Sequence, residues 1–321
     1  MLNNKLELFF KKNIEIVILF AILLLILFSI TVLTGGKFLK AYSLEAMAFQ
    51  MPLLGLFALA QLIPMLTGGI DLSIISTANL CGIITALILT KLNTWYAIYI
   101  AIFLGLISAL LVGIFNGLII SYVGVPPIIA TLGSMILVKG VSLAITKGYV
   151  ISGFPDNFLF IGNGYLLGIP IPFVIFVLFN LIIAIILYKT TLGISIYMVG
   201  SNPLATLFSG INNKKVLFKS YLISSFISGI ASLVMISRFN AAQADYGGSF
   251  LLLTVLICVL GGVSPSGGFG RVLGVFISVT ILQIIGTGFN LLGLSSHLSN
   301  ALWGIILIFV IALNKLYSRI R

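Results

Sequence analysis

Residues 14–33 read IEIVILFAILLLILFSITVL. A helix rises about 1.5 Å per residue, so an apolar run of this length crosses the roughly 30 Å hydrocarbon core of a bilayer. A secretory signal has a shorter apolar core that ends at a small-residue cleavage site, and nothing of the A-x-A kind follows this run. We therefore expect residues 14–33 to be a retained membrane-spanning helix.

The composition extends this prediction to the whole chain. Of its 321 residues, 60% are hydrophobic and 7% are charged, whereas soluble domains are about 45–50% apolar and about 25% charged. The mean hydropathy is +1.28, and no segment is polar enough to form a separate soluble domain. The sequence predicts a single transmembrane domain over residues 1–321, of the all-α class, crossing the cell membrane many times.

The other apolar stretches are bounded by glycine, proline or charged residues. With the first run they predict ten transmembrane helices, at residues 14–33, 46–66, 72–90, 95–120, 128–147, 170–188, 217–236, 249–262, 270–290 and 297–314. Ten crossings return the C-terminus to the side of the N-terminus. A long loop at about residues 189–216 then lies on that same side.

The basic residues indicate which side this is. The chain has 17 Lys and Arg against 6 Asp and Glu, a formal net charge of +11. Basic residues gather in cytoplasmic loops of membrane proteins; here they occur at both termini and in residues 189–216, whereas residues 148–169 contain none. We therefore expect cytoplasmic termini. Four basic residues count against this orientation, because it places them on the outer side: Lys37, Lys40, Lys91 and Arg238. The flanking position of the basic residues favours membrane insertion over nucleic-acid binding.

Few residues are suited to catalysis or metal binding. Cys81 and Cys258 lie inside apolar runs, which argues against a disulfide or a metal site. The chain has one histidine, six acids and no G-x-x-x-x-G-K-[ST] phosphate-binding loop. We expect a protein that is not an enzyme and that binds no metal or cofactor itself.

Two segments resemble each other across the chain. Residues 67–73 read TGGIDLS and residues 260–266 read LGGVSPS, and each ends one apolar span and begins another; Phe115-Asn116 is repeated as Phe289-Asn290. Paired glycine breaks are typical of transporters built from two related halves. The alternative is that glycine-rich membrane turns resemble each other by chance.

The loop at residues 189–216 contains the pattern of a short helix. Asn202 is a good N-cap, Pro203 suits the first helical position, and Gly210 suits a left-handed residue after the end. Leu204, Leu207, Phe208 and Ile211 share one face. Such a short helix is marginal in water alone, so its apolar face requires a partner. The pattern allows either docking in a cytosolic subunit or lying on lipid headgroups.

The ordered motifs resemble the permease subunits of bacterial ATP-binding-cassette (ABC) importers for simple sugars, the ribose, xylose and galactose permease family. The resemblance covers about residues 45–314 and rests on Gly68-Gly69-Ile70-Asp71-Leu72-Ser73, Ala130-Thr131-Leu132-Gly133, residues 200–211, Gly261-Gly262 with Gly267-Gly268 and Gly270-Arg271, and Asn290-Leu291-Leu292-Gly293. One departure is Ala205-Thr206, where the family usually has two alanines. We expect this change to adjust the docking of the short helix and to leave its function intact.

The resemblance implies the partners and the mechanism. Two permeases would enclose the pathway, two ATPase subunits would carry ATP and Mg²⁺, and an extracytoplasmic solute-binding protein would deliver a ribose-, xylose- or galactose-type sugar. Closure of the ATPases would then push the short helix and rock the spans. The residues expected to couple to the ATPase are Asn202, Pro203, Leu204, Ala205, Leu207, Phe208, Gly210 and Ile211.

Polar residues in the spans are candidates for the pathway. An ionised carboxylate at mid-bilayer costs about 2.5–3.5 kcal/mol on insertion scales, so Asp71 either caps the span that begins near Leu72 or faces the mouth of the pathway. Lys139 is either paired, with Asp71 or a helix-end carbonyl, or carried toward water by a bend after Pro126-Pro127. Further candidates, which could instead bond helix to helix, are Ser73, Asn79, Asn116, Gln243 and Asn290.

Two other functions stay open. Related permeases handle nucleosides and other small polar solutes, so the sequence alone does not name the cargo. A carrier driven by an ion gradient usually buries several ionisable groups, and Asp71 and Lys139 are the candidates for such groups here.

Overall fold

The computed structural model describes residues 14–92, 96–295, 298–299, 301–305 and 308. Within these residues, eight helices are long and apolar enough to cross a membrane. They are α2 (Ile14–Leu33), α3 (Ala41–Leu66), α4 (Ile74–Lys91), α5 (Ala97–Leu118) with its continuation η2 (Ile119–Val123), α6 (Pro127–Thr146), α8 (Ile171–Lys189), α11 (Asn213–Phe239) and α13 (Val272–Leu291). This confirms the all-α class and the first seven predicted spans, and also the ninth.

The two other predicted spans have different outcomes. Residues 249–262 form α12 (Phe250–Leu260), which has 11 residues and is therefore about 16 Å long, too short to cross the bilayer alone. The tenth predicted span, 297–314, falls largely outside the described residues. The predicted loop at 189–216 contains two helices, α9 (Thr191–Ser201) and α10 (Pro203–Phe208). The helix α9 follows α8 after a single residue, Thr190, so the sequence contains no clear break that separates the two helices.

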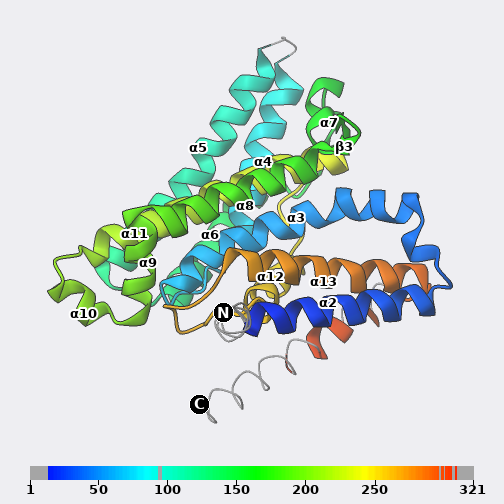
Figure 1. The fold of residues 1–321 in the computed structure, drawn as a ribbon. Helices are drawn as coiled ribbons and strands as arrows, with labels where there is room; N and C mark the ends of the chain where they lie inside the picture. Colours follow the sequence, from blue (N-terminus) through cyan, green and yellow to red (C-terminus); the bar gives the residue numbers. More distant parts are fainter. Residues whose placement is uncertain (1–13, 93–95, 296–297, 300, 306–307, 309–321) are drawn as a thin grey trace.

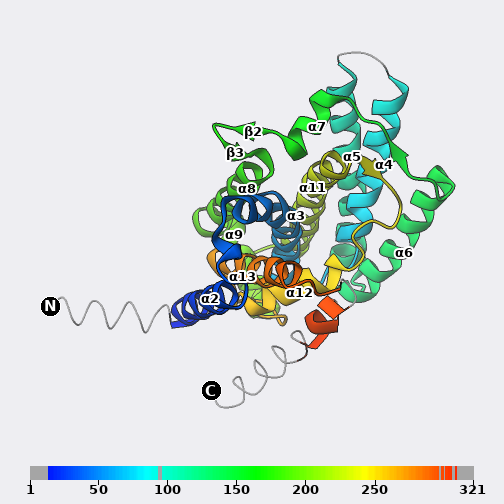
Figure 2. The same ribbon diagram turned by 90° about the vertical axis from the view of Figure 1, so that its right-hand side faces the viewer.

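The core of the bundle forms around α3 and α11, which lie at the centre in Figure 2. In α3, 78% of the apolar window is buried, and in α11 67%, whereas in α2 the buried share is only 11%. The helix α2 packs along α13 at the edge of the molecule. The side chains of α2 that face away from α13 are therefore available to lipid.

Close helix packing depends on small side chains along α11. A Cβ added to Gly113 of α5 would lie 2.7 Å from the Ser225 hydroxyl oxygen of α11, so only glycine fits there. The hydroxyl of Ser232 of α11 donates to the carbonyl oxygen of Ala78 in α4. Small and hydroxylated residues let membrane helices approach closely and bond to one another, which explains why a helix with many serines occupies the core.

The two ends of the bundle differ in structure. At one end lie η1 (Lys37–Leu39), α7 (Asp156–Asn163) and two short antiparallel pairs, β1 (Ile151–Ser152) with β4 (Ala241–Ala242) and β2 (Tyr165–Leu166) with β3 (Ile169–Pro170). The helix α10 lies at the opposite end of α8 and α11 (Figure 1). The segments that the charge pattern assigned to opposite sides of the membrane are thus separated by the length of these helices.

The two glycine breaks have the same backbone geometry. Gly68 and Gly262 adopt left-handed φ values of 83° and 79°. In both turns the next residue's N–H bonds to the carbonyl five positions back, from Gly69 to Pro64 and from Val263 to Cys258. This is the Schellman ending of a helix, which glycine favours. The similarity of residues 67–73 and 260–266 in sequence is therefore also a similarity in structure.

Candidate functional site

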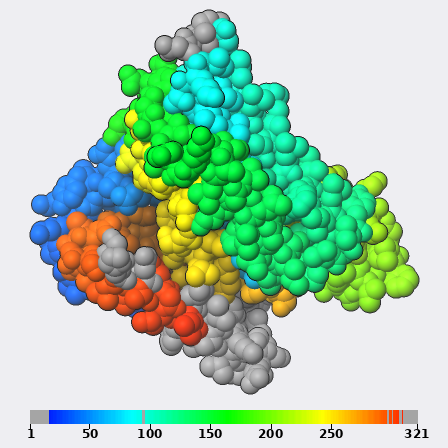
Figure 3. Space-filling model, turned by 180° about the vertical axis from the view of Figure 1, so that it is seen from behind, coloured from blue at the N-terminus to red at the C-terminus, as the bar shows by residue number. Residues whose placement is uncertain are grey.

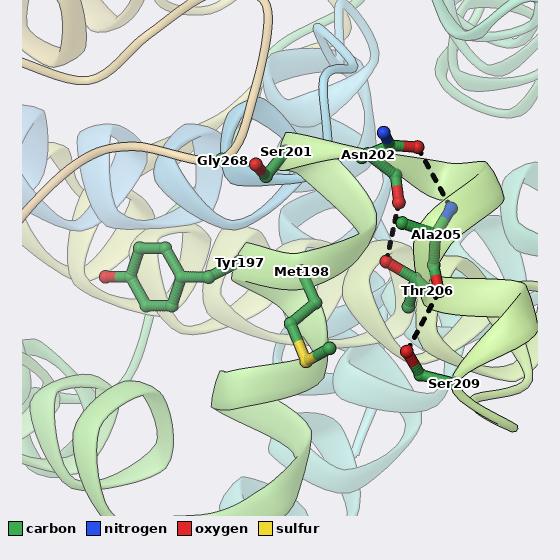
Figure 4. A pocket seen from close by; sticks show the side chains of 8 residues that line it. All are labelled: Tyr197, Met198, Ser201, Asn202, Ala205, Thr206, Ser209 and Gly268. Atoms are coloured by element: carbon green, nitrogen blue, oxygen red, sulfur yellow. Dashed lines mark hydrogen bonds between the residues drawn. The ribbon is translucent and has the colours of Figure 1, made fainter.

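The corner between α9 and α10 has the caps that the sequence predicts. The Asn202 side-chain oxygen accepts a hydrogen bond from the Ala205 N–H at 3.0 Å (Figure 4), and Pro203 is the first residue of α10. Gly210 is left-handed, with φ 80°, and the Ile211 N–H returns to the carbonyl of Thr206. The six-residue helix is thus fixed at both ends by hydrogen bonds that its own sequence supplies.

One face of α10 is apolar and exposed. Leu204, Leu207 and Phe208 expose 69%, 57% and 89% of their surfaces. Ile211 differs from the prediction because it is half-buried and packs against the main core. Only three of the four predicted apolar residues are therefore available to a partner.

Thr206 also differs from the prediction. It is 1% exposed, and its hydroxyl donates to the Asn202 carbonyl at 2.7 Å (Figure 4). The side chain therefore faces the bundle and not a docking partner. The departure at Ala205-Thr206 concerns the packing beneath α10, and Ala205 alone of the pair is exposed.

A pocket of about 360 Å³ lies behind this corner. Its lining residues come from α9, α10 and the loop before α13: Tyr197, Met198, Ser201, Asn202, Ala205, Thr206, Ser209 and Gly268 (Figure 4). The Tyr197 hydroxyl donates to the Gly270 carbonyl at 2.9 Å. Burial raises the pKa of this hydroxyl, so it stays protonated as a donor. The loop is thereby tied to α9.

Three chain segments meet at the C-terminal end of α9. The Gly268 N–H donates to the carbonyl of Leu66, the last residue of α3, at 2.9 Å. A Cβ on Gly200 of α9 would overlap both groups of that hydrogen bond. A Cβ on Gly267 would lie 2.6 Å from the Gly68 nitrogen. We call the contact of Leu66, Gly68, Gly200, Gly267 and Gly268 the glycine junction. It joins α9 by backbone contact to the first glycine break and to the loop that follows the second.

Asp71 is buried within a hydrogen-bond network. Its Oδ1 accepts from the N–H of Ser73 at 2.9 Å and from its hydroxyl at 2.6 Å, and Oδ2 accepts from the Ser224 hydroxyl at 3.1 Å. The Asn116 Nδ2 donates to the Ser73 hydroxyl at 2.8 Å. The structure thus brings together Asp71, Ser73 and Asn116. Asp71 has 0% exposure and lines neither of the two pockets described here; it joins Ser73, the N-cap residue of α4, to Ser224 of α11.

Lys139 has a partner that the sequence analysis did not name. Its Nζ lies 2.8 Å from Oδ2 of Asp245, in the segment between β4 and α12. Asn79 reaches the same segment from α4, by hydrogen bonds to the carbonyls of Ala244 and Tyr246. Lys139, Asn79 and Asp245 line a second pocket. The expected pairing of Lys139 with Asp71 or with a helix-end carbonyl is not the pairing that the structure contains.

The remaining predicted pathway residues are placed elsewhere. Gln243 is half-buried just after β4 and lies outside the lining of this second pocket. Asn290 is exposed near the end of α13, whereas Asn116 is fully buried in α5. The second repeat, of Phe115-Asn116 with Phe289-Asn290, thus joins residues in unlike surroundings.

Three groups were missed in the sequence. Asp245 is one of only six acids in the chain. Because so few acids are present, each of them is a candidate ion-pair partner for a lysine inside a span. Ser224 and the contact of Gly200 with Gly268 carried no local signal, since both depend on how distant segments pack.

These features define a class of protein. With eight apolar helices of membrane-crossing length among the described residues, the chain is a multi-pass protein of the cell membrane. The family model described as branched-chain amino acid transport system / permease component matches residues 43–311. The chain belongs to this permease family and is therefore a transport subunit.

Curated relatives cover most of the chain. It is 35% identical over 294 residues to the ribose import permease protein RbsC of Bacillus subtilis (strain 168), across 91% of this chain and 90% of the relative. It is 32% identical over 264 residues to the autoinducer 2 import system permease protein LsrD of Enterobacter sp. (strain 638), across 80% of each. The corresponding LsrD of Yersinia enterocolitica is 33% identical. No solved structure matches the chain. The resemblance seen in the motifs is confirmed.

Proposed function

We propose that this chain is the transmembrane permease subunit of an ABC importer that moves a simple sugar across the cytoplasmic membrane. The observation that carries the proposal is the exposed apolar face of α10, at Leu204, Leu207 and Phe208. Full burial of one such side chain contributes about 1.5–3 kcal/mol, so three of them suit a protein partner. The names of the relatives, a ribose importer and autoinducer 2 importers, support the sugar-like cargo.

The glycine junction supplies the route from α10 to the membrane helices. A push on α10 acts on α9, and Gly200 of α9 is in backbone contact with the end of α3 and with the loop before α13. Backbone atoms in a closely packed interior cannot move aside as the end of a flexible side chain can, so these contacts pass on a displacement. The movement of α10 would therefore reach both glycine breaks together and shift the helices that start there.

The importer requires further subunits. A separate ATPase would bind ATP and Mg²⁺ and hold α10, so α10 would lie on the cytoplasmic side. A second permease, of this chain or a related one, would complete the pathway. An extracytoplasmic solute-binding protein would deliver the sugar to the end that carries α7 and the β pairs (Figure 1).

The test separates this importer from a carrier driven by an ion gradient. The tagged chain is purified from its native membrane with the subunits that accompany it, and the complex is placed in liposomes with the binding protein and D-ribose outside. We expect uptake that requires internal ATP and continues when an uncoupler removes the ion gradients. Uptake that needs a gradient and no ATPase would contradict the proposal. A nucleoside supplied in place of ribose tests the alternative cargo in the same assay.

A further inference from the structure

A pocket of about 500 Å³ lies between α4, α6 and the segment leading into α12. The surface on which α6 and the chain around residue 250 lie side by side faces the viewer in Figure 3. The volume is in the range of sites for small ligands, which are mostly apolar with a few placed polar groups. Here the polar groups are Ser76, Asn79, Lys139 and Asp245.

Asn79 lines this pocket and has a side-chain acceptor without a partner among the described residues. Its Nδ2 donates to the Ala244 carbonyl at 3.2 Å and to the Tyr246 carbonyl at 3.1 Å, which fixes the backbone on both sides of Asp245. Its Oδ1 is buried and has no hydrogen-bond partner among the described residues. A buried acceptor is costly unless a donor reaches it. A hydroxyl group of a bound molecule is such a donor.

The neighbouring hydroxyl adds a second acceptor. Ser76 is buried and donates its proton to the Ser73 carbonyl at 2.9 Å, so its oxygen remains able to accept. Ser76 and Asn79 are three positions apart on α4 and therefore share a face of that helix. The inner part of the pocket thus offers uncharged groups that accept hydrogen bonds.

The charged groups of the pocket neutralise each other. Lys139 Nζ and Asp245 Oδ2 are 2.8 Å apart, with 43% and 66% of their side chains exposed. An ammonium group has three donors and a carboxylate about four acceptor positions, so the pair keeps free capacity on both sides. A charged solute would have to separate the pair, whereas a neutral solute with several hydroxyls can bond to both members without separating them.

We propose that this pocket is a transit site for a neutral polyhydroxylated solute, in which Lys139 and Asp245 bind hydroxyls at the entrance and Asn79 Oδ1 accepts from one inside. This rests on the proposed importer function and names the site on its pathway. The largely apolar lining and the exposed ion pair make the site a weak one, as transport requires, because the solute must also leave. The competing ligand is an amino acid zwitterion, which would place one charge on each member of the pair.

Protection from thiol modification tests the site without transport. Gly140 lines the pocket, and a Cβ there meets no atom of the described residues within 4 Å. Gly133, also in α6, has the same open space and lies outside the pocket lining. The native Cys81 and Cys258 have 0% exposure, which keeps them from a charged methanethiosulfonate reagent. Gly140→Cys and Gly133→Cys are therefore a matched pair of reporters.

We expect D-ribose or D-xylose at high millimolar concentration to slow modification of the Gly140→Cys variant severalfold. The Gly133→Cys variant is expected to react at an unchanged rate, and leucine is expected to protect neither. Met135→Cys, at another lining position, repeats the measurement if Gly140→Cys does not accumulate. In the Gly140→Cys background, Lys139→Gln with Asp245→Asn keeps hydrogen bonding and should retain protection, whereas leucine at both positions should abolish it.

Two outcomes overturn the proposal. If no sugar slows modification of either lining position, the pocket is not a polyol site. If leucine alone protects, the ion pair binds a zwitterion. The labelling needs neither ATP nor an ATPase, so protection by ribose without ATP-driven uptake would refute the importer and leave the site in place. Uptake without protection would do the reverse.

Discussion

The backbone N–H of Gly268 donates a hydrogen bond to the carbonyl oxygen of Leu66, and the two atoms are 2.9 Å apart. Leu66 is the last residue of α3, the most buried of the long helices, and Gly268 lies in the loop that precedes α13. Gly200 of α9 fits against both groups of this bond. The short helix α10, which starts at Pro203, is therefore three residues from the point where the end of α3 meets the loop before α13.

Gly200→Ala should disturb the glycine junction. The added Cβ overlaps backbone atoms of Leu66 and Gly268, which cannot move away as a side-chain tip could. Overpacking of this kind costs about 1–3 kcal/mol, so we expect a lower apparent melting temperature and reduced ATP-driven uptake. Differential scanning fluorimetry in detergent and uptake in liposomes measure the two effects.

The control for this substitution is Gly133→Ala in α6. Within the part of the chain that the structure describes, a Cβ at Gly133 meets no atom within 4 Å. Alanine also favours a helix over glycine by about 1 kcal/mol. This variant should keep its melting temperature and uptake. If Gly200→Ala has the same melting temperature and uptake as Gly133→Ala, the close contact at the glycine junction contributes to neither stability nor transport.

The sequence could predict the features whose cause is local. The caps of α10 follow from Asn202, Pro203 and Gly210, each of which acts on its own backbone within a few residues. The run at residues 14–33 predicts α2 because its length and apolarity alone suffice. The two similar turns at Gly68 and Gly262 were visible for the same reason, since a Schellman ending needs a glycine at one position.

The sequence could not predict contacts between distant segments. Asp71 and Ser224 are 153 positions apart, and Asn116 and Ser73 are 43 apart, so no spacing rule connects them. The inward orientation of Thr206 depends on how α9 and α11 pack beneath it. Likewise, the pairing of Lys139 with Asp245 brings α6 to a distant segment whose backbone Asn79 of α4 binds on both sides of Asp245.

Phe208→Asp should uncouple ATP hydrolysis from uptake. Phe208 is 89% exposed and makes no part of the bundle core, so the membrane helices should stay folded. Loss of one apolar contact of about 1.5–3 kcal/mol weakens docking roughly 10- to 100-fold, and Leu207→Asp in the same chain should add to the loss. Phe208→Leu keeps an apolar surface and should retain most uptake. Wild-type coupling in the double aspartate variant would exclude docking through α10.

Asn202→Ala should weaken α10 without affecting the spans. The side chain accepts the Ala205 N–H at the start of the helix, and loss of an N-cap costs about 1 kcal/mol. A six-residue helix has little other stability in water, so we expect fewer sugar molecules moved per ATP hydrolysed and an unchanged melting temperature of the bundle. Asn202→Asp keeps an acceptor at the cap and should restore the ratio. An equal loss in both variants would show that the cap is not the cause.

Substitutions of Asp71 separate its charge from its hydrogen bonds. In Asp71→Asn, the amide oxygen can still accept from Ser73 and the amide nitrogen can donate to the Ser224 hydroxyl oxygen. Only the favourable interaction of a carboxylate with the start of α4 is lost, at about 0.3–1 kcal/mol. Asp71→Ala leaves the N–H and hydroxyl of Ser73 and the hydroxyl of Ser224 without the acceptor they have now.

Each buried polar group left without a partner costs about 1–3 kcal/mol. We therefore expect Asp71→Ala to lower the apparent melting temperature strongly and to reduce the amount of protein in the membrane, whereas Asp71→Asn stays close to the wild type in both. Uptake per molecule should follow the same order, because the network joins α4, α5 and α11 beside the first glycine break. A stable Asp71→Ala protein that transports normally would show that Ser73, Asn116 and Ser224 are held by other contacts. A stable Asp71→Asn protein without uptake would instead assign the carboxylate charge a direct part in transport.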